Sequence, residues 1–249
     1  MKTICLNTWG CRESESLFKF IKENNSADIY CFQEVLKSGI GKTSRDELKS
    51  GYEDIAKLLP NHKGYFSEYG EGGYYSEKSR DLDFKYGIAC FVNSKLNQKF
   101  VQGVRLYDLE TKWTDYSGRF AAGAAMAVEA GDYAVLNIHG LWQGGIKKDT
   151  EAKLVQSKQI ISLAEIANGK KIICGDFNLL PETKSIQMLG DVYTDLIQKY
   201  KIVSTRSTLY PKELRYSDYA FVDSNISINR FLVPDVTISD HLPLVIDFD

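Results

Sequence analysis

Residues Lys171–Asn178 read KIICGDFN, an apolar run that ends in glycine, aspartate and asparagine. A short run of this kind, rich in β-branched residues and closed by polar ones, is typical of a buried strand. The same plan recurs along the chain, because Asn7, Gln33-Glu34 and Asn137–Gly140 each end another apolar run. Loops that leave the carboxyl edge of a sheet are where α/β folds usually build their sites. We therefore expect these polar groups to meet at one edge.

The rest of the chain mixes strand and helix patterns. Apolar runs predict strands at Thr3–Asn7, Ile29–Gln33, Gly87–Val92, Phe120–Val128, Tyr133–His139, Lys171–Gly175, Tyr216–Val222 and Leu244–Phe248. Helical spacing follows Glu13–Glu15 and also Asp149, which we expect to be an N-cap, and Pro181 predicts a shorter helix that ends near Leu189–Gly190. Tyr65–Tyr75 has little periodicity and predicts a long loop or an irregular hairpin. The mixture favours an α/β (α+β) fold in which mixed sheets pack together with helices outside.

Composition limits the alternatives. The 249 residues are 43% hydrophobic and 26% charged, which suits a large core and argues against disorder, collagen or a coiled coil. We expect a single domain, 1–249. The net charge of −2 gives no strong positive field over the whole surface, so a polyanion would be bound locally. No apolar run approaches the roughly 20 residues that span a bilayer, so we expect no membrane insertion.

The cysteines indicate the redox setting. Their number, five, is odd, and none forms a C-x-x-C pair. Cys5, Cys31, Cys90 and Cys174 lie inside apolar runs, so a disulfide framework is not expected. The sequence passes from Met1 straight into a strand pattern, without a stretch that resembles a signal peptide. We expect a reducing, cytoplasmic location.

The polar edge has the composition of a metal-assisted hydrolytic site. A carboxylate beside an amide suits a hard cation such as Mg2+, which takes oxygen ligands together with substrate phosphate oxygens. No Cys/His spacing for zinc is present. His139 and His241 could supply a base or a transition-state donor, whereas His62 follows Pro60-Asn61 in an expected loop. Each residue alone is more often structural, but together they fit attack of water on a phosphoester.

Six ordered blocks carry a resemblance to a known family. They are Leu6-Asn7, Gln33-Glu34-Val35, Asn137-Ile138-His139-Gly140, Gly175-Asp176-Phe177-Asn178, Tyr216-Ser217-Asp218-Tyr219 and Ser239-Asp240-His241-Leu242-Pro243-Leu244. From residue 4 to residue 244 the chain resembles the endonuclease/exonuclease/phosphatase superfamily, which includes DNase I-like and abasic-site nucleases. The resemblance implies a four-layer sandwich, with two mixed β-sheets packed face to face and helices on the outer faces.

The resemblance also implies a metal site. Glu34 would be the principal Mg2+ ligand, with Asn7 beside it and Asp240 near the metal, directly or through water. Mn2+ is expected to substitute. Abasic-site nucleases have an acidic residue two positions after the first-strand asparagine, and Trp9 stands at that place here. A second metal position therefore loses support.

The catalytic roles implied by the resemblance fall on five residues. Asp176 would orient or deprotonate the attacking water, and Asn178 would hold the phosphate or that water. His139 would donate to a phosphate oxygen. His241 would act with Asp218, whose carboxylate fixes the imidazole tautomer and favours its charged form. Whether His241 is a general base or a charged stabiliser of the transition state stays open at this point.

Two family features have several candidates each. For the active-site tyrosine of the middle loop they are Tyr65, Tyr69, Tyr74 and Tyr75. For the acidic partner of His139 they are Glu68, Glu71, Asp81 and Asp83, each of which could equally be an ordinary loop charge.

Substrate contacts are expected next to the presumed site. Trp142 follows His139 closely and could stack on a base, while Lys147 or Lys148 meets phosphate. Packing of Trp142 under its own loop, with solvated lysines, is the alternative. Arg206 is the cation that we favour for phosphate contact, and Trp113 and Arg119 are comparable candidates.

Three functions follow from these residues. The first is a Mg2+-dependent phosphodiesterase acting on nucleic acid, short or single-stranded because the charge argues against coating a long duplex. The second is a phosphatase or diesterase acting on lipid headgroups or small soluble phosphates. The third is a catalytically silent binding module, which is disfavoured because unused buried carboxylates are costly to keep charged. We expect a monomer.

Overall fold

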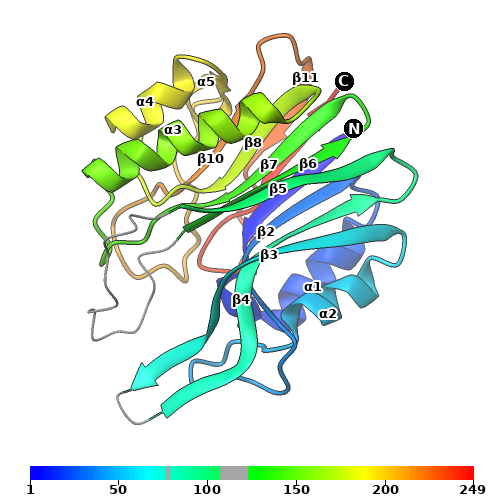
Figure 1. Cartoon of the computed structure of the whole chain (residues 1–249), viewed down its shortest axis with the longest axis vertical. Coiled ribbons are helices and arrows are strands. Elements are labelled where there is room, and N and C mark those ends of the chain that lie inside the picture. The colour runs from blue at the N-terminus through cyan, green and yellow to red at the C-terminus, as the bar shows by residue number, and fades with distance from the viewer. Residues whose placement is uncertain (77–78, 107–122) are drawn as a thin grey trace.

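Two six-stranded sheets form the frame of the molecule (Figure 1). The computed structural model describes residues 1–76, 79–106 and 123–249. The first sheet has the order β11 (Ile228–Leu232), β12 (Leu244–Phe248), β1 (Lys2–Asn7), β2 (Ile29–Lys37), β4 (Ser79–Asn93) and β3 (His62–Ser76). The second has the order β5 (Gln98–Leu106), β6 (Gly123–Ala130), β7 (Tyr133–His139), β8 (Lys170–Asp176), β10 (Asp218–Val222) and β9 (Thr194–Asp195). Both sheets are mixed, since β1 is parallel to β2 and β7 to β8 while other pairs are antiparallel.

Helices cover the outer faces and complete four layers (Figure 1). The helices α1 (Ser14–Glu23) and α2 (Gly51–Leu58) flank the first sheet. The helices α3 (Glu151–Ile166), α4 (Lys184–Gly190) and α5 (Leu196–Lys199) flank the second. The expected four-layer sandwich is confirmed. Within the described residues, no helix has the length and apolar character needed to cross a membrane.

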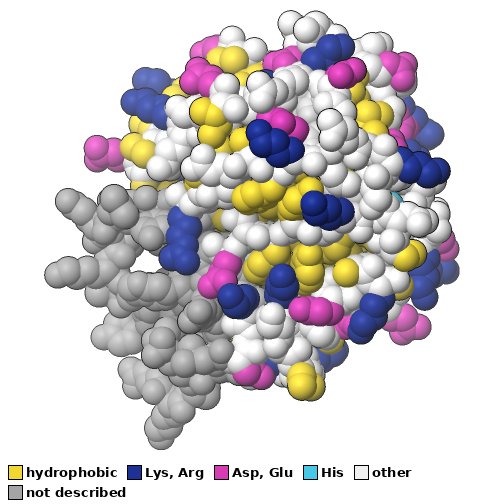
Figure 2. Space-filling view, turned by 45° about the vertical axis from the view of Figure 1, so that its right-hand side comes forward, with side chains coloured by type: hydrophobic (Ala, Val, Ile, Leu, Met, Phe, Trp, Pro, Cys, Tyr) yellow, Lys and Arg dark blue, Asp and Glu magenta, His cyan; other side chains and the backbone are white. Residues whose placement is uncertain are grey.

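The facing sheets enclose the larger apolar core. Strand residues of β6, β7 and β8 are almost all fully buried, as continuous apolar runs predict for strands covered on both faces. All five cysteines are free thiols and are buried. Cys31 and Cys90 lie opposite each other on β2 and β4, with their Sγ atoms 3.7 Å apart. The surface in Figure 2 is different, because basic and acidic side chains are interspersed there around hydrophobic ones.

A buried polar bridge joins the sheets just below the site. Gln33 on β2 donates from Nε2 to Asn137 Oδ1 on β7, and the two atoms are 2.5 Å apart. Asn137 in turn donates from Nδ2 to the carbonyls of Phe32 and Ala89 in the first sheet. Both side chains are fully buried. These two residues, grouped with the polar edge in the sequence, therefore hold the two sheets in register rather than reach substrate.

Several local predictions need correction. Thr150, not Asp149, caps α3 by accepting from the backbone N–H of Lys153. Asp149 instead accepts from the N–H groups of Lys184 and Ser185 at the start of α4, so it stabilises the following helix.

Helix α4 begins at Lys184, after a turn that contains Pro181, and not at Pro181 itself. Tyr65–Tyr75 is part of the long strand β3, whose antiparallel pairing with β4 shifts register at three places, so the alternative of an irregular hairpin is confirmed and that of a long loop is wrong. The pattern gave no sign of α2, β5 or β11, and of the predicted strand Phe120–Val128 the structure describes the part from Gly123, the start of β6.

Candidate active site

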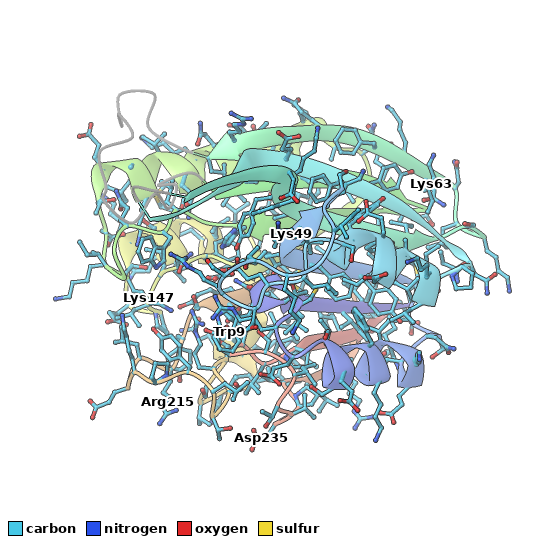
Figure 3. The ribbon with its side chains drawn as sticks, turned by 90° about the horizontal axis from the view of Figure 1, so that it is seen from below. Trp9, Lys49, Lys63, Lys147, Arg215 and Asp235 are labelled. Atoms are coloured by element: carbon cyan, nitrogen blue, oxygen red, sulfur yellow. The ribbon has the colours of Figure 1, made fainter. Side chains whose placement is uncertain are left out.

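Strand direction brings the predicted residues to one end of the sandwich. Parallel pairing carries Asn7 and Glu34 to the same end of the first sheet. In the second sheet His139, Asp176 and Asp218 lie in one row across β7, β8 and β10, so their side chains share a face. This end lies opposite the chain termini in Figure 1, and Figure 3 looks onto it, with Trp9 and Lys147 labelled.

A β-bulge in β2 aims Glu34 into the site. Pairing with β4 shifts between Phe32 and Val35, and Glu34 takes a φ of 52°, which a residue other than glycine rarely adopts. Its Oε2 accepts from Tyr86 Oη at 3.0 Å, and its Oε1 accepts from Asn7 Nδ2 at 3.1 Å. Backbone strain of this kind persists where surrounding structure enforces it, often at functional sites.

Asn7 connects the two sheets at the centre of the site. Its Oδ1 accepts from the backbone N–H of Trp9, so its Nδ2 points to the carboxylates. That amide nitrogen lies 3.1 Å from Glu34 Oε1 and 3.1 Å from Asp176 Oδ2. Asn7 thus holds two like charges side by side.

Asp176 is buried and fully hydrogen-bonded. Its Oδ1 accepts from Ser217 Oγ at 2.5 Å and from the N–H of Asn178 at 2.8 Å. Burial alone would raise its pKa, but the electrostatic effect of His241, Arg206 and the neighbouring basic groups outweighs burial and holds the pKa of Asp176 well below its usual range. Asn178 has a φ of 54° and donates from Nδ2 to the carbonyl of Gly140 at 3.1 Å. Asp176 is therefore a stable anion and a weak proton acceptor.

His241 lies between two carboxylates and an arginine. Its Nδ1 is 2.8 and 2.9 Å from the two oxygens of Asp218, and its Nε2 is 3.6 Å from Asp176 Oδ2. Burial and Arg206 lower the pKa of His241, but Asp218, Asp240 and Asp176 raise it further, so the net shift is upward. Arg206 Nη1 approaches Nε2 to 2.5 Å. Because arginine only donates, this contact fits the neutral imidazole, with Nδ1–H directed to Asp218.

Hydrogen bonds join the segment around Arg206 to the segment around His241. Thr205 accepts at its carbonyl from the N–H of Leu242, and the N–H of Ser207 donates to the carbonyl of Asp240. Arg206 Nη1 also donates to Asp240 Oδ2 at 2.9 Å. Burial, together with the charges of Glu34 and Asp176, raises the pKa of Asp240, and His241 and Arg206 offset this only in part.

The acidic and imidazole groups of the site form a donor set for a metal ion. Glu34, His139 and Asp176 each offer a ligand atom, and these atoms lie within 4.8 Å of one another. Asp240 Oδ1 is buried and has no hydrogen-bond partner within the described part of the chain. An orphaned carboxylate oxygen beside two other carboxylates is costly unless a cation satisfies it. The residues therefore fit a hard divalent cation bound mainly through oxygen.

The remaining predicted contacts divide into two groups. Lys147 is buried and donates from Nζ to the carbonyl of Tyr216 at 2.9 Å, whereas Lys148 is exposed. Burial, with the charge of Arg206, lowers the pKa of Lys147 to about 8. Trp142 is half-buried in the loop before α3. Trp113 and Arg119 lie outside the described residues.

Tyr86 and Lys153 were not predicted. Tyr86 lies on β4 and binds Glu34, although the candidates for an active-site tyrosine were all on β3. Lys153 on α3 is fully buried and donates to the carbonyls of Ile146 and Asn178, so it fixes the loop that carries Asn178.

Among the acids suggested as partners of His139, two have described side chains. Glu68 pairs with Lys85, and Asp83 pairs with Lys49. Glu34 Oε1 lies 3.6 Å from His139 Nε2. The side chains of Glu71, Asp81, Tyr69, Tyr74 and Tyr75 lie outside the described set.

A model of the Endonuclease/Exonuclease/phosphatase family matches residues 4–241, from the first strand to the histidine of the site. The chain belongs to this family. Members of the family are phosphoester hydrolases, so the chain belongs to that class of enzyme. No curated protein matches the sequence.

Solved structures support the same fold. A mannosyl-6-phosphatase from Bacteroides thetaiotaomicron is 17% identical with a TM-score of 0.64, covering 100% of this chain and 99% of that chain. The human Nocturnin catalytic domain is 16% identical with a TM-score of 0.61, covering 100% and 93%. ANGEL2, a 2',3'-cyclic phosphatase, is 15% identical with a TM-score of 0.67, covering 99% and 94%. At this identity the likeness is one of fold.

Proposed function

We propose that this enzyme is a Mg2+-dependent phosphodiesterase that hydrolyses phosphoester bonds of short or single-stranded nucleic acid. One observation carries the proposal. The Asp218–His241 pair, the anionic Asp176 and the carboxylate of Glu34 converge with Arg206 in one buried site, at the distances given above. This set supplies a water-activating pair, a cation site and a donor for a phosphate oxygen.

Glu34 and Asp240 would hold the Mg2+, with Asn7 and Tyr86 fixing the carboxylate of Glu34. Bound Mg2+ would offset charge on the phosphate oxygens and orient the ester. Asn7 turns its amide nitrogen to the carboxylates, which supports a positioning role in this arrangement.

The attacking water would lie against Asp176 and His241. Asp176 orients it, because an anion with so low a pKa keeps little tendency to take a proton. Neutral His241, with Nδ1–H bound to Asp218, is the stronger base and takes the proton at Nε2. Arg206 leaves Nε2 for a phosphate oxygen, and His139 donates to another. The water oxygen bonds to phosphorus as the ester P–O bond breaks, and the departing oxygen takes a proton from solvent and leaves as the alcohol.

The charge distribution favours a small or terminal target. Arg206 and Lys147 are buried at the site, and the chain as a whole has a net charge of −2. Binding to long duplex DNA instead uses many exposed cations along the backbone. A short strand or a strand end meets the buried cations without such a track.

The experiment is a substrate panel with a metal requirement. We expect Mg2+ or Mn2+ to support hydrolysis of bis(p-nitrophenyl) phosphate and of short single-stranded oligonucleotides, and a chelator to abolish it. Glu34→Gln and Asp176→Asn should remove most of the activity, while the exposed Asp235→Asn should not. Full activity in chelator would refute the mechanism. Faster hydrolysis of sugar phosphates or sphingomyelin than of oligonucleotides would refute the substrate class.

A further inference from the structure

Two buried cations lie against one aromatic ring beside the catalytic centre. The Arg206 guanidinium carbon is 4.1 Å from the ring centroid of Tyr210, and Lys147 Nζ is 5.6 Å from the same centroid. Arg206 is 7% exposed and Lys147 is 5% exposed. Asp240 pairs with Arg206, but within the described residues no carboxylate forms an ion pair with Lys147, so a bound anion would meet the charge of Lys147.

Neither cation has its full set of acceptors. Arg206 Nε is buried and has no hydrogen-bond partner within the described residues, and its Nη1 serves Asp240 and His241. Lys147 has three N–H donors, of which one reaches the carbonyl of Tyr216. A buried donor without a partner is costly, and a phosphate group presents the acceptor oxygens that these donors lack.

The two cations occupy different positions relative to the reaction. Arg206 touches His241 Nε2, the atom that we assign to the attacking water, so Arg206 reaches the phosphate that reacts. Lys147 is anchored to the loop before β10, and the hydrogen bond that fixes it goes to the backbone of Tyr216 rather than to a catalytic side chain. Tyr210 joins the two cations.

We propose that Lys147, with Arg206 Nε and the edge of Tyr210, forms a subsite for a second phosphoryl group next to the scissile phosphate. The inference rests on the proposed function and narrows its substrate class. Two sources would present this chemistry: the terminal phosphate of a short oligonucleotide, or the neighbouring phosphate of a pyrophosphate-linked nucleotide. In both, Arg206 bridges the reacting phosphate and its neighbour.

The test compares matched substrates on matched variants. Wild-type enzyme, Lys147→Met and the exposed neighbour Lys148→Met are assayed on a diadenosine monophosphate with and without a 5'-phosphate, and on a pyrophosphate-linked dinucleotide. Either the 5'-phosphorylated dinucleotide or the pyrophosphate-linked dinucleotide places its second phosphate in the subsite. For that substrate we expect Lys147→Met to raise KM about tenfold or more, while KM for the unphosphorylated dinucleotide stays nearly unchanged. Lys148→Met should behave as wild type, and Lys147→Arg should restore part of the preference.

Two outcomes would overturn the subsite. One is an equal rise in KM for all three substrates, which would place Lys147 on the scissile phosphate or in the frame of the loop. The other is a wild-type enzyme without preference for the extra phosphate. The substrate whose KM rises in Lys147→Met shows which kind of second phosphate the subsite binds.

A binding experiment distinguishes the proposed phosphate subsite from the proposed hydrolytic function. Inorganic pyrophosphate and inorganic phosphate are titrated calorimetrically into wild type and Lys147→Met at saturating Mg2+. We expect pyrophosphate to bind more tightly to wild type and to lose that advantage in Lys147→Met. Loss of the advantage with no hydrolysis of any ester would refute the proposed function alone. Hydrolysis without any pyrophosphate advantage would refute the subsite alone.

Discussion

Replacing Asp218 with asparagine removes a charge and leaves the shape of the site. Both oxygens of Asp218 lie within 2.9 Å of His241 Nδ1, and each side chain is 3% exposed. Asparagine can accept from Nδ1–H through its oxygen, or donate from its amide nitrogen to Nδ1 and place the imidazole proton on Nε2. Either way His241 becomes a weaker base at Nε2.

The magnitude follows from the separation of the charges. Opposite charges about 4 Å apart, at an effective dielectric constant of about 20, attract by about 4 kcal/mol. The asparagine dipole keeps part of this attraction, so we expect the pKa of His241 to fall. A weaker base and a less stabilised imidazolium should lower kcat by about 10²–10³-fold.

The dependence of activity on pH shows in which direction the pKa of His241 changes. The pKa of His241 is raised in the wild type, and a base works only when unprotonated, so wild-type activity falls as the pH drops through that raised pKa. In Asp218→Asn the acid limb should move to lower pH while the plateau falls. Initial rates on bis(p-nitrophenyl) phosphate between about pH 5 and 9 measure both.

Asp235→Asn, at an exposed position near the same end of the molecule (Figure 3), is the matched control, and circular dichroism checks the fold. A plateau within twofold of wild type, or an alkaline limb that moves instead of the acid limb, would show that His241 is not the base.

Three further predictions concern stability and the metal. Gln33→Leu should lower the free energy of unfolding in urea by about 2–4 kcal/mol, because it leaves the buried Oδ1 of Asn137 without its donor; the double variant with Asn137→Leu should lose less than the sum of the two single changes. Asp176 has a lowered pKa in the folded state, so the stability it contributes is present above its unfolded pKa of about 3.9 and is lost as the pH falls below that value. The melting temperature of Asp176→Asn should therefore depend less on pH in that range than the melting temperature of the wild type. Parallel plots of melting temperature against pH for the two proteins would contradict this. Glu34→Gln should weaken Mg2+ or Mn2+ binding about 10–100-fold by calorimetry, and Tyr86→Phe should weaken it less; unchanged affinity in Glu34→Gln would exclude it as a ligand.

The strand pattern was sufficient to locate the ends of the sheets. Apolar runs that stop at a polar residue fix where a strand leaves the core, so Asn7, His139 and Asp176 could be assigned to one edge before any pairing was known. Helix caps were less predictable. Asp149 and Thr150 are both good caps, and the choice depended on α4, whose N–H groups lie beside Asp149 only in the folded chain.

Tyr86 shows why some residues of the site could not be predicted from the sequence. The bulge at Glu34 places two residues of β2 opposite one residue of β4, and side chains alternate between faces with period two. Which tyrosine on the neighbouring strands faces the carboxylate therefore depends on the exact position of one extra residue. The strain at Glu34, with its φ of 52°, is the physical sign of that insertion, and no propensity of glutamate announces it. Residues next to a bulge that carries a metal-site carboxylate are accordingly where a sequence argument is expected to miss partners, and Tyr86 is one that it missed.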